Sequence, residues 1–175
     1  MAEIKEHDDN FWKILDAALE LDVKKGHLKW TLSDLSRKSG ITRSLIYYYF
    51  GRSKESILNE AIKLIGTELA GLNKKREKLW LEGQFLESLI EARSIFDKAP
   101  YLHLLIAEHI GRDTELGVAV RDIQTRFIAK INRVFKLSDN NKSRAIYSLY
   151  WGMLFAPMQD KKTYEHSIKV LKNFI

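Results

Sequence analysis

Hydrophobic residues recur along this chain every three or four positions, the spacing that places them on one face of a helix. The first such stretch contains Phe11, Ile14, Leu15, Ala18 and Leu19. No segment alternates apolar and polar residues as a strand does, and the two prolines, Pro100 and Pro157, fall where helices are expected to begin or end. The pattern predicts an all-α protein without internal repeats.

A long helix is predicted to begin after Ser53, whose hydroxyl can cap its first turn. Its apolar positions are Ile57, Ala61, Leu64, Ile65 and Leu72. We expect this helix to continue toward Trp80 and to join two parts of the chain, residues 1–52 and residues 53–175. Further helices are expected over residues 85–96, 101–110, 116–137, 143–156 and 164–175.

Residues 31–54 have the order of a helix-turn-helix. Thr31 can cap one short helix and forms a capping-box pattern with Asp34, while Thr42 can cap a second. Gly40 lies between them, where a helix must stop. The core-facing positions of the two helices are expected to be Leu32, Leu35, Ile46 and Phe50. The segment therefore predicts a recognition helix whose first turn can meet DNA bases.

Charge supports this interpretation of the segment. The chain has a formal net charge of +6, and eight basic residues against the single acid Asp34 lie between Lys24 and Lys54, an excess of +7. A run of charge is often only a solvated face, but here it coincides with the helix-turn-helix. Contact with DNA phosphates is the favoured explanation.

The residues of this segment resemble the N-terminal DNA-binding domain of the TetR family of bacterial transcriptional regulators. The resemblance covers about residues 10–60 and includes Ile14–Ala18 and Gly26 upstream. Its central elements are Thr31, Leu35-Ser36, Ser39-Gly40-Ile41-Thr42, Arg43-Ser44, Tyr47-Tyr48-Tyr49-Phe50 and Lys54. Ser36 and Ser39 replace the usual alanines, and Ser44-Leu45 departs from the common pair, so the operator sequence cannot be inferred.

The resemblance implies a three-helix DNA-binding domain, residues 1–52, joined by a long helix to a helical regulatory and dimerisation domain, residues 53–175. It implies a double-stranded DNA operator as partner, contacted by the residues that match the family motif. A tyrosine hydroxyl can donate to phosphate, and Lys54 at a helix start is a candidate phosphate anchor. The predicted DNA-binding residues are Thr31, Thr42, Arg43, Ser44, Tyr47, Tyr48 and Lys54.

In this family the last two helices commonly pair with those of a second subunit, which implies a homodimer and a palindromic operator. The expected seam consists of Ile146, Leu149, Tyr150, Met153, Leu154, Ile168, Leu171 and Phe174. The alternative is that these residues belong to the core of a single chain, and both arrangements can hold in part.

The C-terminal part could also enclose a small-molecule pocket, as in many similar regulators. The candidate lining residues offer flat apolar walls with a few polar groups: Trp80, Phe96, Tyr101, His103, His109, Tyr147 and Trp151. Each could instead be an ordinary core residue, and the effector itself cannot be inferred from the sequence.

An enzyme is not expected. His103 and His109 are six residues apart, which places them on different faces of a helix and does not fit a zinc-protease helix. No glycine-rich phosphate loop is present, and the absence of cysteine excludes disulfides and thiolate metal sites. We therefore expect neither a metal nor a cofactor.

Two functional classes remain after this. The favoured one is a TetR-like regulator, a ligand-responsive repressor, although the chain does not distinguish a repressor from an activator. The alternative is a helical protein-interaction module with weak or vestigial DNA binding. No signal peptide is expected from the polar start, and the most apolar stretch, Tyr147–Met158, is too short to span a bilayer. A cytoplasmic location without membrane contact is expected.

Overall fold

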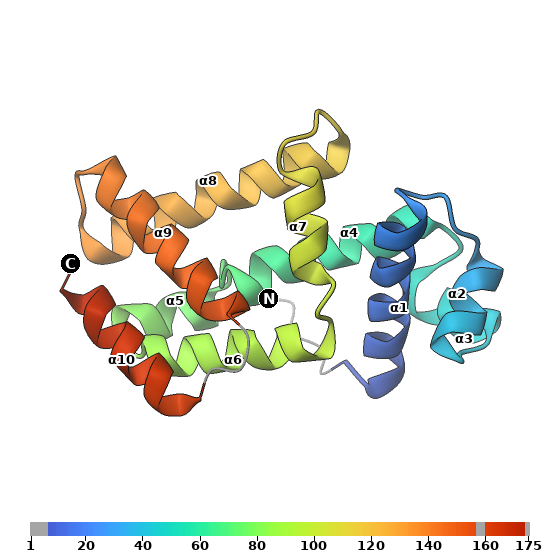
Figure 1. Cartoon of the computed structure of the whole chain (residues 1–175), viewed down its shortest axis with the longest axis horizontal. Coiled ribbons are helices and arrows are strands. Elements are labelled where there is room, and N and C mark those ends of the chain that lie inside the picture. Colours follow the sequence, from blue (N-terminus) through green and yellow to red (C-terminus); the bar gives the residue numbers. More distant parts are fainter. Residues whose placement is uncertain (1–6, 157–159, 174–175) are drawn as a thin grey trace.

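The computed structural model describes residues 7–156 and 160–173 of the 175-residue chain (Figure 1). The protein is all-helical over these residues, as the hydrophobic spacing predicted, and none of their helices is long and apolar enough to cross a membrane. The elements are α1 (Asp9–Lys25), α2 (Leu32–Ser39), α3 (Arg43–Phe50), α4 (Lys54–Leu64), the π-helical turn η1 (Ile65–Leu69), α5 (Lys74–Leu81), α6 (Phe85–Lys98), α7 (Leu102–His109), α8 (Glu115–Phe135), α9 (Asn140–Phe155) and α10 (Lys161–Lys172).

Helices α1, α2 and α3 pack together at one end of the molecule (Figure 1). Leu35 of α2 and Ile46 of α3 are fully buried, and the ring of Phe50 stacks on that of Phe11 with centroids 4.9 Å apart. Leu32 is partly buried against the same core. The inward positions predicted for the two short helices are therefore confirmed, and burial of these side chains fixes α2 and α3 on α1.

The predicted continuous helix from Ser53 toward Trp80 is wrong, because the chain breaks between α4 and α5. Ser53 caps α4 through its hydroxyl, but the helix widens into the π-helical turn and then stops at Gly71, which adopts a left-handed φ of +60°. The Asn73 side chain then accepts the amide N–H three residues on at 2.8 Å and starts α5. Gly71 as a helix stop and Asn73 as a helix cap are sequence signals of this break, but the regular apolar spacing across them favoured one continuous helix.

Two cations are buried beside this break. Lys130 of α8 donates from Nζ to the carbonyl of Gly71 at 2.6 Å, and its Nζ lies 4.2 Å from the centroid of the Trp80 ring. Arg76 donates to the carbonyl of Ser88 in α6. The Lys130 bond satisfies a carbonyl group at the break, where the chain is no longer helical. Burial lowers the pKa of Lys130 to about 7.

The C-terminal part is a bundle with an aromatic centre. Trp80, Phe127 and Tyr150 meet edge to face or tilted, with ring centroids 5.0 to 5.7 Å apart. The Tyr150 hydroxyl donates to the carbonyl of Leu69 at 2.5 Å. The π-helical turn η1, which contains Leu69 and follows α4, is thereby bound to α9 inside the bundle.

Helix α7 lies between the three-helix end and the bundle and packs on both α1 and α8 (Figure 1). Gly117, in the first turn of α8, allows the loop after α7 to lie against that helix. A Cβ atom at this position would lie 2.1 Å from the carbonyl oxygen of Arg112 and 2.6 Å from that of His109. Only a residue without a side chain fits there.

Substituting Gly117→Ala is expected to lower the free energy of unfolding by about 2 to 3 kcal/mol, because backbone atoms rather than a flexible side chain must move. Gly111→Ala is the matched control in the same loop, since a Cβ there meets nothing within 4 Å. Chemical denaturation of both variants measures the difference. Equal midpoints for the two variants would contradict the packing described for Gly117.

Candidate DNA-binding site

The turn between α2 and α3 is built by short-range hydrogen bonds. The Thr31 hydroxyl accepts the Asp34 amide at 3.1 Å while the Asp34 carboxylate accepts the Thr31 amide at 2.9 Å, so the predicted capping box is present. Gly40 ends α2 in the left-handed conformation, with φ 70° and ψ 11°. Ser36 also donates to the carbonyl of Ile41 at 2.7 Å. Together these bonds fix the angle at which α3 leaves α2.

The first turn of α3 is open to solvent. Thr42 caps it by accepting the Leu45 amide at 3.4 Å, and the Thr42, Arg43 and Ser44 residues are all exposed. Arg43 makes no ion pair with any residue in the described part of the chain. A helix start with unused amides and a free guanidinium suits contact with phosphates and base edges.

The three tyrosines of α3 have different surroundings. Tyr48 is 77% exposed, whereas Tyr49 is half-buried and donates its hydroxyl to the Asp8 carboxylate. This hydrogen bond is the main cause of a lowered pKa at Asp8. The guanidinium carbon of Arg52 lies 5.6 Å from the centroid of the Tyr47 ring. Tyr47 and Tyr48, but not Tyr49, therefore have hydroxyls without an internal carboxylate partner among the described residues.

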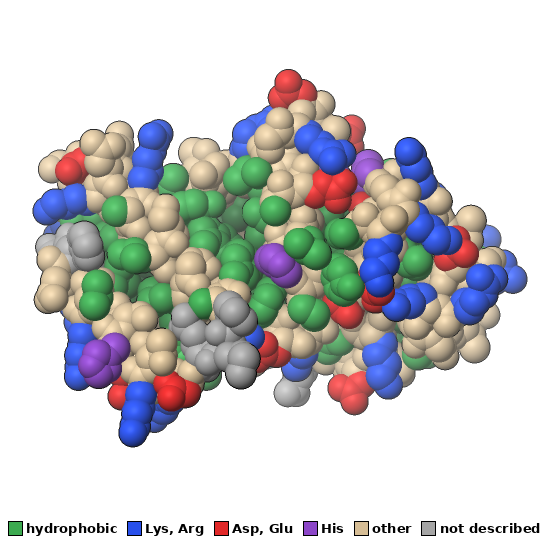
Figure 2. All heavy atoms as spheres, viewed as in Figure 1, with side chains coloured by type: hydrophobic (Ala, Val, Ile, Leu, Met, Phe, Trp, Pro, Cys, Tyr) green, Lys and Arg blue, Asp and Glu red, His purple; other side chains and the backbone are tan. Residues whose placement is uncertain are grey.

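The basic residues of this end divide into two groups. Lys24, Lys25, Arg37 and Lys38 pair with the carboxylates of Glu20 and Asp34. The Lys25 hydrogen bond is the largest cause of the low pKa of Asp34, about 2. A second group has no acidic partner among the described residues: Lys29, Arg43 and Arg52. Figure 2 shows Lys and Arg side chains gathered over the three-helix end.

Lys54 does not extend freely from α4. Its Nζ donates to the carbonyls of Leu28 at 2.5 Å and Trp30 at 2.9 Å and lies 5.7 Å from the centroid of the Trp30 ring. The ammonium group has three N–H donors, so one remains for a phosphate. Its contact with DNA stays a prediction, and the structure adds a second task, which is to hold the turn before α2.

The structure separates the residues predicted to form an effector pocket. Trp80 lies in the aromatic core, where its indole N–H donates to the Ser88 hydroxyl at 2.9 Å. Phe96, His103 and Trp151 gather around the ring of Phe155. His109 lies elsewhere, against α1. Tyr147 lines a cavity with residues of α8 and α9, and Tyr101 is partly buried at the start of α7. The seven residues therefore do not surround one cavity.

Most residues of the predicted dimer seam lie inside the chain. Its members Ile146, Tyr150, Met153, Leu154, Ile168 and Leu171 are buried within the chain itself. These six side chains stabilise α9 and α10 on the bundle and do not form a free surface. Leu149 is 36% exposed, and Phe174 lies outside the described residues.

One cluster was missed by sequence reasoning. Asp22, His27 and His109 lie together where α1 and its following turn meet the end of α7. Their separation along the chain gives no motif spacing, so periodicity could not find them. The available signal was weaker: His109 stands out in an apolar stretch of α7, but nothing in the sequence links it to Asp22 and His27.

Comparisons with known proteins find sequence similarity in the N-terminal part of the chain. Residues 14–61 match the family model described as bacterial regulatory proteins, tetR family. A segment of 56 residues, 32% of this chain, is 38% identical to the HTH-type transcriptional regulator BetI of Agrobacterium fabrum and spans 27% of that protein.

Solved structures share the fold over nearly the whole length. A candidate fatty acid metabolism regulator of Clostridium perfringens has a TM-score of 0.64 at 15% identity, with 93% of this chain and 98% of that chain covered. NalD of Pseudomonas aeruginosa, the secondary repressor of the MexAB-OprM multidrug efflux pump, has a TM-score of 0.50 at 21% identity, covering 96% and 98%.

These proteins are regulators rather than enzymes, in agreement with the expectation from the residues. The match lies over the capped turn and the exposed first turn of α3 described above. The N-terminal segment of the chain is therefore similar to the tetR family of bacterial regulatory proteins, and the fold of the chain is similar to that of solved TetR-family regulators.

Proposed function

We propose that this protein is a TetR-like transcriptional regulator. It would act in the cytoplasm as a homodimeric, ligand-responsive repressor that binds a palindromic operator. Residues 1–52 serve as its DNA-binding domain and residues 53–175 as its regulatory and dimerisation domain. The observation that carries the proposal is the exposed first turn of α3. Thr42, Arg43 and Ser44 lie there at the start of a helix whose inner side chains, Ile46 and Phe50, are buried. The likeness in fold to NalD, a repressor, supports the direction of regulation.

The contacts divide by role. Arg43 is placed for base edges, because its side chain lies at the end of the helix that enters the major groove. Tyr47, Tyr48 and Lys54 lie where backbone phosphates would run, and Thr31 lies at the start of the supporting helix. Phosphate contacts position the domain, and base contacts select the sequence.

Dimerisation would use the outer face of α9 and α10. Leu149 of α9 and Val170 of α10, which is 50% exposed, are apolar residues on these faces, whereas the other seam candidates are internal. A two-fold axis through this face makes the same patch contact itself. The two α3 helices would then read half-sites about 34 to 36 Å apart.

Response to a ligand requires the DNA-binding end to move relative to the bundle. Helix α4 packs on α1, α3 and α8, so a shift at its C-terminal end would reach the helix-turn-helix. An effector weakens operator binding only if it binds the released arrangement more tightly.

Selection from a random duplex pool at about 150 mM salt tests the operator proposal. The wild type is expected to recover one palindrome. Arg43→Ala should recover a motif degenerate at one position of each half-site and bind the original palindrome with a loss of about 1 to 3 kcal/mol. Recovery of no motif by a folded wild type would favour the protein-interaction alternative instead.

Lys54→Met is expected to act twice, because its Nζ holds two carbonyls and can also reach a phosphate. The unfolding midpoint should fall, and the slope of log affinity against log salt should become shallower by about one unit for each phosphate lost. Lys63→Met is the control, since Lys63 is an exposed lysine of the same helix that pairs only with Glu60 among the described residues. An unchanged salt slope in Lys54→Met would remove this residue from the phosphate contacts.

Leu149→Arg is expected to convert a dimer into a monomer, because a guanidinium would be buried in an apolar, self-complementary contact. Leu81→Arg is the matched control, since Leu81 is a leucine that is 64% exposed but belongs to α5 and not to the proposed α9 and α10 face. Sedimentation velocity distinguishes the two states. A dimer that survives Leu149→Arg unchanged would place the interface on another face.

A further inference from the structure

The cluster missed by sequence reasoning has the chemistry of a metal site. Asp22, His27 and His109 each offer one ligand atom, and the three atoms lie within 4.8 Å of one another. His27 Nδ1 is 3.1 Å from Asp22 Oδ2, and the two imidazole rings meet edge to face with centroids 4.9 Å apart. Imidazole and carboxylate groups are the ligands that zinc and its neighbours among the transition metals prefer when no thiolate is present.

His109 is the strongest part of this observation. Its side chain is fully buried, and neither Nδ1 nor Nε2 has a hydrogen-bond partner among the described residues. A buried polar group without a partner destabilises the fold by about 1 to 3 kcal/mol. The residue therefore has an unused ligand atom facing two other ligands.

Asp22 is oriented as a metal-binding carboxylate would be. Its Oδ1 accepts the Leu28 amide and the Trp30 indole N–H, both at 2.8 Å. These two bonds fix the carboxylate and leave Oδ2 directed at the histidine. Outer hydrogen bonds of this kind orient ligands in protein metal sites.

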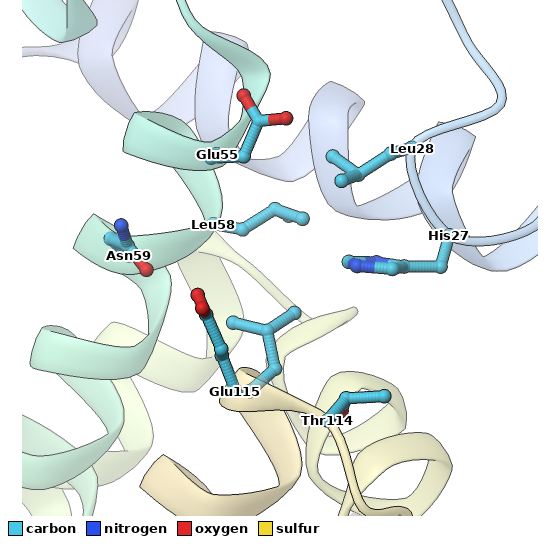
Figure 3. Close-up of a pocket in the computed structure, with 8 residues that line it drawn as sticks. His27, Leu28, Glu55, Leu58, Asn59, Thr114 and Glu115 are labelled. Carbon is cyan, nitrogen blue, oxygen red and sulfur yellow. The ribbon is translucent and has the colours of Figure 1, made fainter.

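A cavity of about 210 Å³ adjoins His27 and lies between the two parts of the protein. Figure 3 shows His27 and Leu28 from the turn after α1, Glu55 and Asn59 from α4, and Glu115 from α8 around this space. The volume is below the roughly 300 to 1,000 Å³ of cavities that hold drug-sized ligands. It suits water or a small anion as a further metal ligand.

We propose that Asp22 Oδ2 and one ring nitrogen from each of His27 and His109 bind a divalent transition metal of the zinc class, with the fourth position open to this cavity. Bonds of about 2.0 to 2.2 Å at tetrahedral angles place ligand atoms roughly 3.3 Å apart. The Asp22 to His27 spacing of 3.1 Å is close to this value, and the ligand atom of His109, within 4.8 Å of the other two, would move closer on binding.

The metal would join the two parts of the molecule. Asp22 and His27 belong to the segment that leads into α2, whereas His109 ends α7 on the regulatory side. Occupancy would fix α7 against α1. If the proposed operator binding holds, occupancy would also change operator affinity, so this consequence rests on the proposed function. The metal site itself does not depend on it.

The test uses the full-length protein freed of metal with a chelator. Titration with Zn²⁺ against a chromophoric competitor is expected to give one tight site per chain. Co²⁺ should give the visible absorption bands of a four- or five-coordinate site. His27→Ala and His109→Phe should each lower zinc affinity by at least about 100-fold, since changes outside the ligand shell already cost 10- to 100-fold.

The controls separate ligand loss from unfolding. His109→Phe replaces the unpartnered ring with an apolar one of similar size, so its metal-free form is expected to melt no lower than the wild type. His166→Ala, at an exposed histidine of α10, should bind zinc as the wild type does. Absence of stoichiometric binding, or binding that survives both His27→Ala and His109→Phe, would overturn the proposal. Operator affinity with and without Zn²⁺ is then measured separately, so a folded protein that binds zinc but no operator contradicts only the proposed function.

Discussion

The carboxylate of Asp22 is fully buried at the end of α1, and its two oxygens organise the chain on both sides of it. One oxygen accepts hydrogen bonds from Leu28 and Trp30, which closes the turn that leads into α2. Burying a carboxylate is unfavourable unless hydrogen bonds replace its water, so these bonds are required once α1 packs. Thr31 follows Trp30 directly, and the start of the helix-turn-helix is thereby positioned.

The same turn is held from its other side by Lys54. Its ammonium group donates hydrogen bonds to the carbonyls of Leu28 and Trp30. The same group lies over the ring of Trp30, which is 1% exposed. Anion and cation thus hold one short segment between α1 and α4. Because α4 also packs on α8, the DNA-binding end and the bundle share a continuous set of contacts. The other oxygen of Asp22 faces His27 and so extends these contacts toward α7.

The break between α4 and α5 shows a second use of buried charge. A helix that ends at Gly71 leaves carbonyl groups inside the protein, and Lys130 supplies the donor that one of them needs. Tyr150 does the same for Leu69. These donors come from α8 and α9, far along the chain, so the bent connection depends on the folded bundle.

The helix-turn-helix could be predicted almost residue by residue. Its caps at Thr31 and Thr42, its stop at Gly40 and its inward side chains all depend on hydrogen bonds and spacings within about four residues. The Gly71 stop and Asn73 cap are equally local, but the apolar positions of α4 and α5 are compatible with one continuous helix, and that periodicity concealed the break. The seven candidate pocket residues do not line one cavity for another reason, because several of these aromatic residues pack on one another in the bundle.

By itself, the sequence determined the all-helical fold and the DNA-binding segment, because both arise from short-range spacing and capping. Tertiary structure alone decided which residues of α9 and α10 remain on the surface, since burial depends on what the rest of the chain covers. It also decided that Asp22 and His27 meet His109. Those residues are brought together by the packing of α7 against α1, an interaction between distant segments that leaves no periodic trace in the sequence.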